Sequence, residues 1–307
     1  MQNKIELLLN NIEKVIVGKR EPIKLVVIAL LAKGHLLIED APGLGKTILA
    51  RALSMSISSK FTRVQCTPDL LPSDITGVSI YNEQIRSFEF KKGPIFTNIL
   101  LVDEINRTTP RTQSSMLEAM AEDQVSSDGN TYELKAPFMV IATQNPIEFH
   151  GTYPLPEAQL DRFFMRIGMG YPSHEDEVKI MQMQEEVHPL EGLESVINLE
   201  DILQLQKEVS KLKIDTRVLQ YISTIVQATR EHEALSYGAS PRGSLALMRA
   251  AQSFALVEGK TFVDPSIIKR MALPVLAHRI VLKPQYLSTK TTEDILVDIL
   301  SKTPVPA

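Results

Sequence analysis

A glycine-rich segment near the N-terminus places the strongest constraint on the fold of this chain. Residues 40–47 read DAPGLGKT, directly after the apolar run 36–38 and directly before a segment with helical patterning. A strand, a glycine loop and a helix in this order are the context in which a loop binds phosphate groups. Gly43 and Gly45 allow the backbone to turn its N–H groups toward phosphate oxygens, and the helix adds its positive N-terminal end.

Individual positions of this loop have distinct expected roles. The ammonium group of Lys46 would contact the outer phosphates of a nucleotide, and the Thr47 hydroxyl would bind Mg²⁺. The usual pattern G-x-x-x-x-G-K-T is altered at its first glycine, which is Asp40 here, and we interpret this as a tolerated variant. A glycine-rich turn without a ligand is the alternative interpretation. The loop backbone around the phosphates would come from Ala41, Pro42, Gly43, Leu44 and Gly45.

A second motif argues against that alternative. Residues 99–102 are four consecutive apolar residues, and Asp103 and Glu104 follow them. Such a run is typical of a strand that is buried on both faces of a parallel sheet, with its carboxyl end at the ligand crevice. Asp103 could hold Mg²⁺, directly or through water, and Glu104 could orient or deprotonate the attacking water. Together the two motifs predict a domain that hydrolyses a nucleotide.

Length and composition indicate an ordinary globular protein. The chain has 307 residues, of which 44% are hydrophobic and 23% are charged, so it can bury a large core and form two domains. The net charge of −4 gives no electrostatic footprint for binding of bulk nucleic acid. The single cysteine, Cys66, excludes an internal disulfide, and no apolar stretch has the length of a membrane span. The first residues lack a signal-peptide pattern, so we expect a soluble cytoplasmic protein.

Strands and helices alternate through the first part of the chain. This alternation is typical of a parallel sheet with right-handed crossovers. Apolar residues at helical spacing predict helices over about 3–16, 22–32, 46–58 and 109–121. Short apolar runs predict strands over 36–39, 61–66, 99–103 and 138–143, with 165–169 as a candidate fifth strand.

Two β-hairpins interrupt the alternation. Residues 78–90 and residues 125–134 each alternate in polarity on both sides of a turn. Pro68 and Pro72 exclude a long regular element ahead of the first hairpin. We interpret residues 67–93 as an insertion between two strands of the sheet.

From Ser173 onward the patterning is wholly helical. Asp215 and Asp264 stand where further helices would begin, because each can cap a helix N-terminus. We therefore expect a domain boundary near Pro172. Residues 1–172 would form a nucleotide-binding core, and residues 173–307 a helical domain.

The order of the motifs resembles that of the AAA+ ATPases, and in detail that of the MoxR family. The resemblance extends from about Val17 to Ala251, which is nearly the whole chain. It implies a P-loop AAA+ core with a five-stranded parallel sheet flanked by helices, two inserted β-hairpins and an all-helical lid. The stretches that carry it are 67–74 (TPDLLPSD), 93–96 (GPIF), 103–107 (DEINR), 142–146 (ATQNP), 155–163 (LPEAQLDRF) and 240–242 (SPR).

The resemblance also implies roles for single residues. Asn145 resembles the sensor-1 residue, which in the family contacts the γ-phosphate or the attacking water. Arg162 resembles the arginine finger, which acts on the nucleotide of a neighbouring subunit, and Arg242 resembles the sensor-2 residue at the start of a lid helix. Ile16 and Val17 would pack near the adenine. On chemistry alone, Asn145 could also be a turn residue, Arg162 a surface arginine, and Arg242 a helix cap or surface charge.

Three functions follow as hypotheses. The resemblance implies an ATPase that uses ATP and Mg²⁺, forms a hexameric ring and remodels or matures a client protein. It further suggests a partner with a von Willebrand factor A domain and a role in complex assembly or metal-cofactor insertion. A nucleic-acid motor or loader would need a basic pore loop or an added DNA-binding module, and we identify no helix-turn-helix. The third hypothesis is a scaffold that binds ATP but hydrolyses it poorly. The presence of Glu104, a candidate base for hydrolysis, argues against it.

Overall fold

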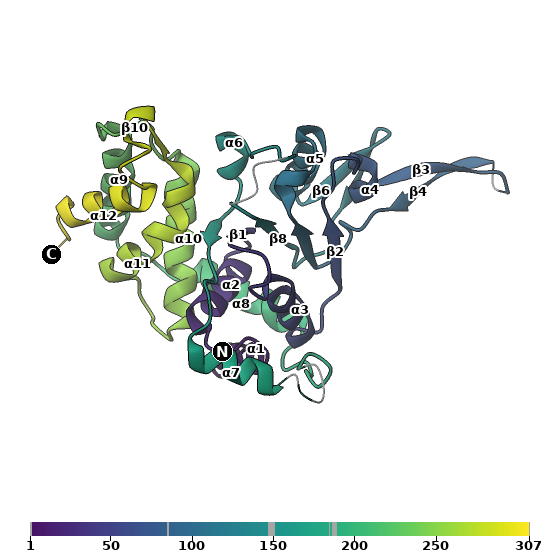
Figure 1. The fold of residues 1–307 in the computed structure, drawn as a ribbon, viewed down its shortest axis with the longest axis horizontal. Helices are drawn as coiled ribbons and strands as arrows, with labels where there is room; N and C mark the ends of the chain where they lie inside the picture. Colours follow the sequence, from purple (N-terminus) through teal and green to yellow (C-terminus); the bar gives the residue numbers. More distant parts are fainter. Residues whose placement is uncertain (1, 85, 147–150, 184, 186–188, 307) are drawn as a thin grey trace.

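The structure of the chain, a computed structural model, describes residues 2–84, 86–146, 151–183, 185 and 189–306. A central sheet carries helices on its faces, a helical region lies at one end, and a long β-hairpin projects at the other end (Figure 1). None of the helices within these ranges is long and apolar enough to cross a membrane. The predicted α/β core followed by a helical region is confirmed.

Five parallel strands form the sheet, in the order β2-β5-β8-β1-β9. Strand β5 lies between β2 and β8, so that Gln65 pairs with Asp103 and Val102 pairs with Ala142. All carboxyl ends therefore lie at one edge of the sheet, and each predicted strand is confirmed. The strands are β1 (Leu36–Glu39), β2 (Phe61–Gln65), β5 (Ile99–Asp103), β8 (Met139–Gln144) and β9 (Met165–Ile167).

Strand β5 is apolar from Ile99 to Val102 because its alternate residues enter two different cores. Ile99 and Leu101 of β5 pack in one cluster, whereas Leu100 and Val102 pack in the other. All four side chains are fully buried, as expected for a sheet that is covered on both faces. The first cluster includes α1 (Gln2–Glu13), α2 (Arg20–Leu31) and α3 (Lys46–Ser56), and the second includes α5 (Pro110–Glu122) and the one-turn helix η1 (Ile105–Arg107).

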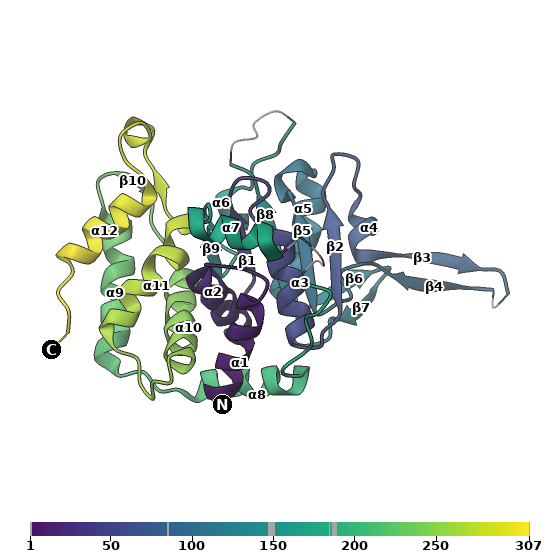
Figure 2. The same ribbon diagram turned by 60° about the horizontal axis from the view of Figure 1, so that its bottom comes forward.

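Two antiparallel hairpins are inserted into the core, as predicted. Hairpin β3–β4 extends away from the sheet in both views (Figures 1 and 2). Its base packs on hairpin β6–β7, since the rings of Phe90 and Tyr132 stack with their centroids 4.0 Å apart. At Gly77, where φ is +104°, a Cβ atom would lie 2.4 Å from Lys91 O, so a side chain is excluded. The elements are α4 (Pro72–Thr76), β3 (Gly77–Asn82), β4 (Ser87–Lys92), β6 (Gln124–Ser127) and β7 (Asn130–Glu133).

The rest of the chain is mainly helical, and side-chain caps define where several helices begin. The side chain of Asp215 caps α9, and that of Asp264 caps α11, so both predicted helix starts are confirmed. A short ribbon of β10 (Leu235–Tyr237) and β11 (Val281–Leu282) adds to the predicted helical lid, and its strands are too short to give a sequence pattern. The helices are α6 (Glu157–Leu160), α7 (His174–Met183), α8 (Leu199–Lys211), α9 (Thr216–Glu231), α10 (Pro241–Val257), α11 (Pro265–Leu276) and α12 (Thr292–Lys302), with the one-turn helices η2 (Ala277–Arg279) and η3 (Pro284–Tyr286).

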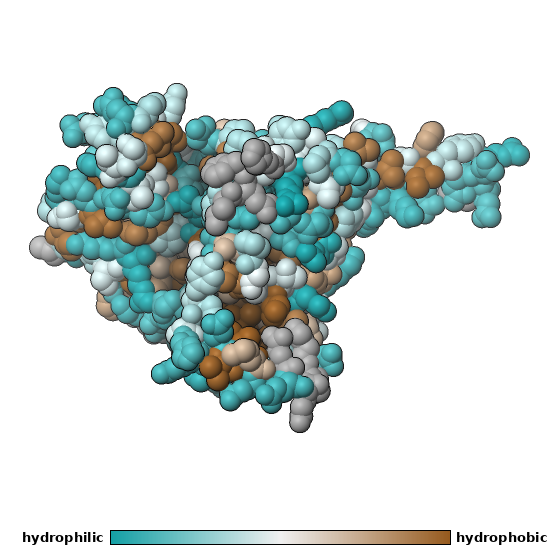
Figure 3. All heavy atoms as spheres, viewed as in Figure 1, coloured by the Kyte–Doolittle hydropathy of each residue, from teal (hydrophilic) through white to brown (hydrophobic). Residues whose placement is uncertain are grey.

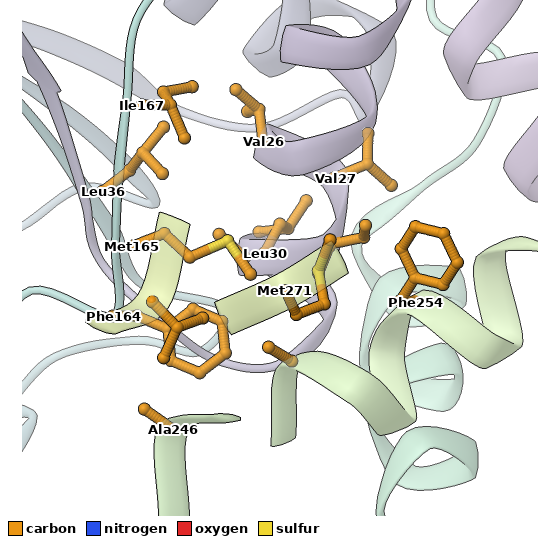
Figure 4. Packing of buried hydrophobic residues seen from close by; sticks show 14 of the residues in the cluster. Val26, Val27, Leu30, Leu36, Phe164, Met165, Ile167, Ala246, Phe254 and Met271 are labelled. Atoms are coloured by element: carbon orange, nitrogen blue, oxygen red, sulfur yellow. The ribbon is translucent and has the colours of Figure 1, made fainter. Parts of the chain in front are cut away.

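A continuous apolar core joins this helical region to the sheet. In Figure 4, Leu30 of α2 and Met165 of β9 lie beside Met271 of α11. The hydroxyl of Ser253 in α10 also donates to Ile28 O in α2, at 2.8 Å. The boundary after residue 172 stays a prediction, because the core continues across it.

Candidate active site

A cavity of about 350 Å³ lies between the glycine-rich loop and the carboxyl ends of β5 and β8. The parallel sheet brings these segments together, although they are far apart in the sequence. The lining includes Pro42, Gly43, Gly45, Lys46, Thr47, Asp103, Glu104 and Asn145, all of which the sequence predicts, together with Ile48, Arg63 and Thr143.

The glycine-rich loop has the backbone geometry of a phosphate cradle. Gly43 and Gly45 have φ values of +81° and +82°, a region that favours glycine. A Cβ atom at Gly43 would meet nothing within 4 Å, so the loop faces open space there. Gly45 is the N-cap of α3 and has no side chain that could accept the first N–H groups of the helix. These donors and the helix dipole are suited to an anion.

Lys46 extends along the inside of this loop. Its Nζ donates a hydrogen bond of 2.6 Å to Asp40 O. Burial lowers the pKa of the Lys46 ammonium, while the nearby carboxylates of Asp40, Asp103 and Glu104 oppose that shift. Phosphate oxygens in the cavity would add negative charge and favour the charged form of the ammonium further.

Asp40, which replaces the first glycine of the usual loop pattern, has a structural role of its own. Its Oδ2 accepts hydrogen bonds from the backbone N–H groups of Met169 and Gly170, both at 2.6 Å. Its Oδ1 accepts a bond of 3.0 Å from the N–H of Ala41. The carboxylate therefore fastens the start of the phosphate loop to the segment that follows β9.

Asp103 is held by side chains from both neighbouring strands. Its Oδ1 accepts a hydrogen bond of 2.6 Å from the hydroxyl of Thr143 on β8. Its Oδ2 accepts bonds of 2.7 and 3.2 Å from the guanidinium of Arg63 on β2. The carboxylate is therefore fixed at the floor of the cavity and is paired with a cation.

Glu104 adopts a left-handed backbone conformation, with φ 57° and ψ 53°. This conformation is rare for residues other than glycine and is often found at functional sites. The backbone N–H of Glu104 donates to Thr143 Oγ1 at 2.9 Å. Its Oε2 accepts a bond of 2.9 Å from Gln65 Nε2 and lies 3.1 Å from Nε of Arg107. Two neighbours therefore set the orientation of this carboxylate.

Arg162 and Arg242 lie apart from this cavity. Both line a second cavity of about 490 Å³, together with Asp161, Arg249 and Arg279. Arg162 Nη1 donates to Leu117 O in α5, at 2.8 Å. Within one chain, the structure does not bring these two arginines to the phosphate loop.

Comparison with known proteins agrees with this architecture. The sequence pattern of the family described as "ATPase family associated with various cellular activities (AAA)" matches residues 35–165, and that of the AAA lid domain matches residues 227–299. Chaperone MoxR1 of Mycobacterium tuberculosis is 38% identical over 301 residues, which cover 95% of this chain and 79% of MoxR1. The chain belongs to the MoxR family of AAA+ ATPases.

Two further proteins are similar to this chain over nearly its whole length. The uncharacterized protein YeaC of Bacillus subtilis is 52% identical over 297 residues, covering 96% of this chain and 93% of YeaC. The crystal structure of a proposed ATPase from Cytophaga hutchinsonii superposes with a TM-score of 0.93 at 38% identity, covering 100% of this chain and 96% of the other. The AAA+ core and helical lid expected of a MoxR protein are thereby confirmed.

The cavity of this MoxR-family chain fits Mg²⁺ in chemical terms. Mg²⁺ prefers oxygen ligands, and it is usually held by one or two protein groups together with substrate phosphates and water. The hydroxyl of Thr47 and the carboxylate of Asp103 are oxygen donors that line the same cavity. They are the residues that would hold the ion beside the phosphates.

The remaining residues of the family motif have less direct support. Among the described residues, Val17, Ala41 and Leu44 are not part of the cavity lining. Ile16 comes closer, since its Cδ1 atom lies 4.0 Å from the position of a Cβ atom on Gly45. The adenine contact of Val17 therefore stays a prediction.

Proposed function

We propose that this chain is a MoxR-type ATPase that hydrolyses ATP with Mg²⁺ and thereby remodels or matures a client protein. The observation that carries the proposal is the convergence of Lys46, Asp103 and Glu104 on one cavity beside a glycine-rich loop. Membership of an ATPase family supports hydrolysis, and the name of Chaperone MoxR1 supports action on a client.

Each residue of the cavity would have a separate task. The loop backbone and the ammonium of Lys46 would bind the phosphates. Thr47 and Asp103 would hold Mg²⁺, which would supply positive charge beside the phosphates. Glu104 would orient and deprotonate the attacking water, and Asn145 would hold that water or the γ-phosphate.

Arg162 and Arg242 would act on the nucleotide of a neighbouring subunit in a hexameric ring. The separation of their cavity from the phosphate loop of the same chain supports this assignment. Negative charge on the γ-phosphate oxygens must be stabilised in the transition state, and an arginine from a neighbour contributes roughly 10³–10⁵ in rate. In a ring, the second cavity of one subunit would meet the phosphate loop of the next.

We assign client contact to hairpin β3–β4. Apolar side chains are visible on the surface of this projecting hairpin (Figure 3). Ile80, Tyr81 and Phe88 are exposed, and the exposed fraction of Phe88 is 74%. Apolar side chains that gather on an exposed element are typical of a protein-binding surface. A partner with a von Willebrand factor A domain, and a role in complex assembly or metal-cofactor insertion, rest on the family resemblance.

Phosphate release by the purified chain, compared with that of Glu104→Gln, tests the proposal. An amide cannot take up the proton of water, so the variant should bind a fluorescent ATP analogue normally and hydrolyse ATP roughly 10²–10⁴ times more slowly. Glu122→Gln neutralises an exposed carboxylate of α5 and serves as the control. Turnover of Glu104→Gln within about twofold of wild type would reject the assigned role.

The same assay separates this proposal from a nucleic-acid motor or loader. Added DNA or RNA should leave the rate unchanged, because a net charge of −4 does not favour a polyanion. To find the client, Glu104→Gln would be held in the ATP state and used to capture proteins from a native lysate. Strong stimulation by nucleic acid would favour the alternative.

A further inference from the structure

Asp161 lies beside Arg162 and contacts two residues of the lid. Its Oδ2 accepts a hydrogen bond of 2.9 Å from the hydroxyl of Ser240. Its Oδ1 accepts a bond of 3.0 Å from Nε of Arg279 in η2. A single carboxylate thus joins the segment after α6 to the N-terminus of α10 and to η2.

The contact with Ser240 leads directly to Arg242. Ser240 is the N-cap of α10, and its hydroxyl oxygen accepts a bond of 3.1 Å from the backbone N–H of Arg242. The hydroxyl proton is donated to Asp161, so the same oxygen connects the carboxylate to the first turn of the helix. This chain of bonds fixes the position from which the Arg242 side chain leaves the helix.

The contact with Arg279 fixes the segment that carries Arg162. Arg279 has only 3% of its side chain exposed, and Nη2 donates to Phe163 O at 2.6 Å. Nη1 donates to Phe164 O at 3.2 Å. A buried guanidinium needs a counter-ion, and Asp161 is the carboxylate that pairs with it. The backbone on the C-terminal side of Arg162 is therefore held by a side chain that depends on Asp161.

We propose that Asp161 is a positioning residue that holds Arg162 and Arg242 in one fixed arrangement, ready for the nucleotide of a neighbouring subunit. The proposal rests on the function proposed above for the two arginines. Both arginines line the second cavity together with Asp161. The carboxylate lies between the core segment and the lid helix that present them, so its loss would let the two move independently. Asp161 itself does not contact the nucleotide in this scheme.

The charge of Asp161 is needed as well as its shape. Burial lowers the pKa of Arg279 to about 10, Asp161 opposes that shift, and the nearby positive charge of Arg242 adds to it. Asp161→Asn keeps the shape of the side chain, but it replaces one of the two acceptor oxygens with an NH2 group and removes the negative charge that pairs with Arg279. We expect this variant to lower kcat for ATP hydrolysis by about tenfold or more, while the Kd for a fluorescent ATP analogue changes by less than about twofold.

Mixed assemblies identify the subunit on which Asp161 acts. Asp161→Asn keeps an intact nucleotide cavity, and Lys46→Ala keeps an intact set of Asp161, Arg162 and Arg242. Alone, Lys46→Ala should be inactive and Asp161→Asn should keep about a tenth of the wild-type kcat or less. A mixture should regain activity at interfaces where Asp161→Asn binds ATP and Lys46→Ala supplies the arginines. A mixture of Asp161→Asn with Arg162→Ala should not regain activity, because neither variant has an intact set of Asp161, Arg162 and Arg242. Mass photometry would establish that mixed rings form.

The outcomes separate failure of this inference from failure of the proposed function. If Arg162→Ala regains activity with Lys46→Ala but Asp161→Asn does not, Asp161 acts within its own subunit and the inference is overturned. If mixed rings form and neither Arg162→Ala nor Asp161→Asn regains activity with Lys46→Ala, the proposed role of the arginines fails. This inference then fails with it. Wild-type kcat in Asp161→Asn would also overturn the inference.

Two variants of Ser240 and one control keep the test valid if Asp161→Asn fails to assemble. Ser240→Ala removes the hydroxyl that links Asp161 to α10, and it should lower kcat and regain activity with Lys46→Ala in the same way. Ser240→Thr keeps a hydroxyl and should retain most of the turnover. Loss of activity in Ser240→Thr would contradict the role assigned to this hydroxyl. Glu157→Gln removes an exposed carboxylate from α6 and should behave as wild type in every assay.

Discussion

The hydroxyl of Thr143 donates a hydrogen bond of 2.6 Å to Oδ1 of Asp103 and accepts one of 2.9 Å from the N–H of Glu104. One buried side chain of β8 thus fixes both acidic residues at the end of β5. Thr143→Val keeps the shape and removes both bonds. Because a hydrogen bond to a charged group contributes about 1.5–3 kcal/mol, we expect the Mg²⁺ concentration for half-maximal ATP hydrolysis to rise by about tenfold or more.

Turnover measured across a Mg²⁺ titration checks this expectation. Thr143→Ser retains the hydroxyl and should stay close to wild type, which separates loss of the bonds from a general effect of substitution. An unchanged Mg²⁺ dependence in Thr143→Val would show that the bond does not contribute to the metal site.

Lys46→Ala should abolish ATP binding. The ammonium is the cation that the phosphate loop itself supplies to the outer phosphates, and it already lies along the inside of the loop. Equilibrium titration with a fluorescent ATP analogue measures the effect. Lys207→Ala, which removes an exposed lysine of α8, should bind as wild type. Unchanged binding by Lys46→Ala would reject the phosphate-loop assignment.

Asp40→Gly should destabilise the protein, although it restores the glycine of the usual loop pattern. The substitution removes the acceptor for the N–H groups of Met169 and Gly170. An unsatisfied donor costs about 1–3 kcal/mol where it is buried, and solvent at this half-buried site reduces the loss. Urea unfolding monitored by circular dichroism would measure it. Asp40→Asn keeps one acceptor oxygen and should lose less, so equal stability of all three proteins would contradict this role.

Sequence patterns predict the strands and the phosphate loop because both depend on local residues. The apolar run of β5 and the acidic pair after it, for example, follow directly from burial on two faces. The sequence does not predict that Arg63, Gln65 and Thr143 belong to the site. Their contacts depend on the sheet order, which places β2 and β8 on either side of β5. A polar residue at the end of each neighbouring strand is the signal that could have found them.

The positions of Arg162 and Arg242 depend on packing between distant segments. The family motif predicts their roles, but only the fold shows that both line a cavity away from the phosphate loop. The contacts of Asp161 with Ser240 and Arg279 span sequence separations that no local pattern encodes.

The tip of hairpin β3–β4 should be dispensable for folding, whereas its base should not. Replacing residues 80–88 with a short Gly/Ser turn removes exposed side chains such as Phe88. Extending the replacement through Phe90 removes the ring that stacks on Tyr132, and an aromatic pair contributes about 0.5–1.5 kcal/mol beyond its buried area. Thermal unfolding should therefore show a lower Tm for the longer replacement alone. Equal Tm values would mean that the stacked pair does not stabilise the core.

Specific ATPase activity should rise with protein concentration across the range in which the chain assembles. A single subunit can supply Lys46, Asp103 and Glu104 to its own cavity, but Arg162 lies outside that cavity. If the guanidinium of a neighbour stabilises charge on the γ-phosphate, monomers lack a contribution of roughly 10³–10⁵ in rate. Activity and mass photometry on the same dilution series would compare turnover with assembly.

Arg162→Ala should bind the ATP analogue normally and remain nearly inactive at every concentration, because substrate binding does not use this residue whereas phosphoryl transfer does. Arg111→Ala removes an exposed arginine from α5 and should follow the wild-type concentration curve. A flat specific activity across the assembly range, together with full activity of Arg162→Ala, would place every catalytic group within one subunit. The geometric reason for expecting a ring would then be lost, since a complete site in one chain needs no neighbour.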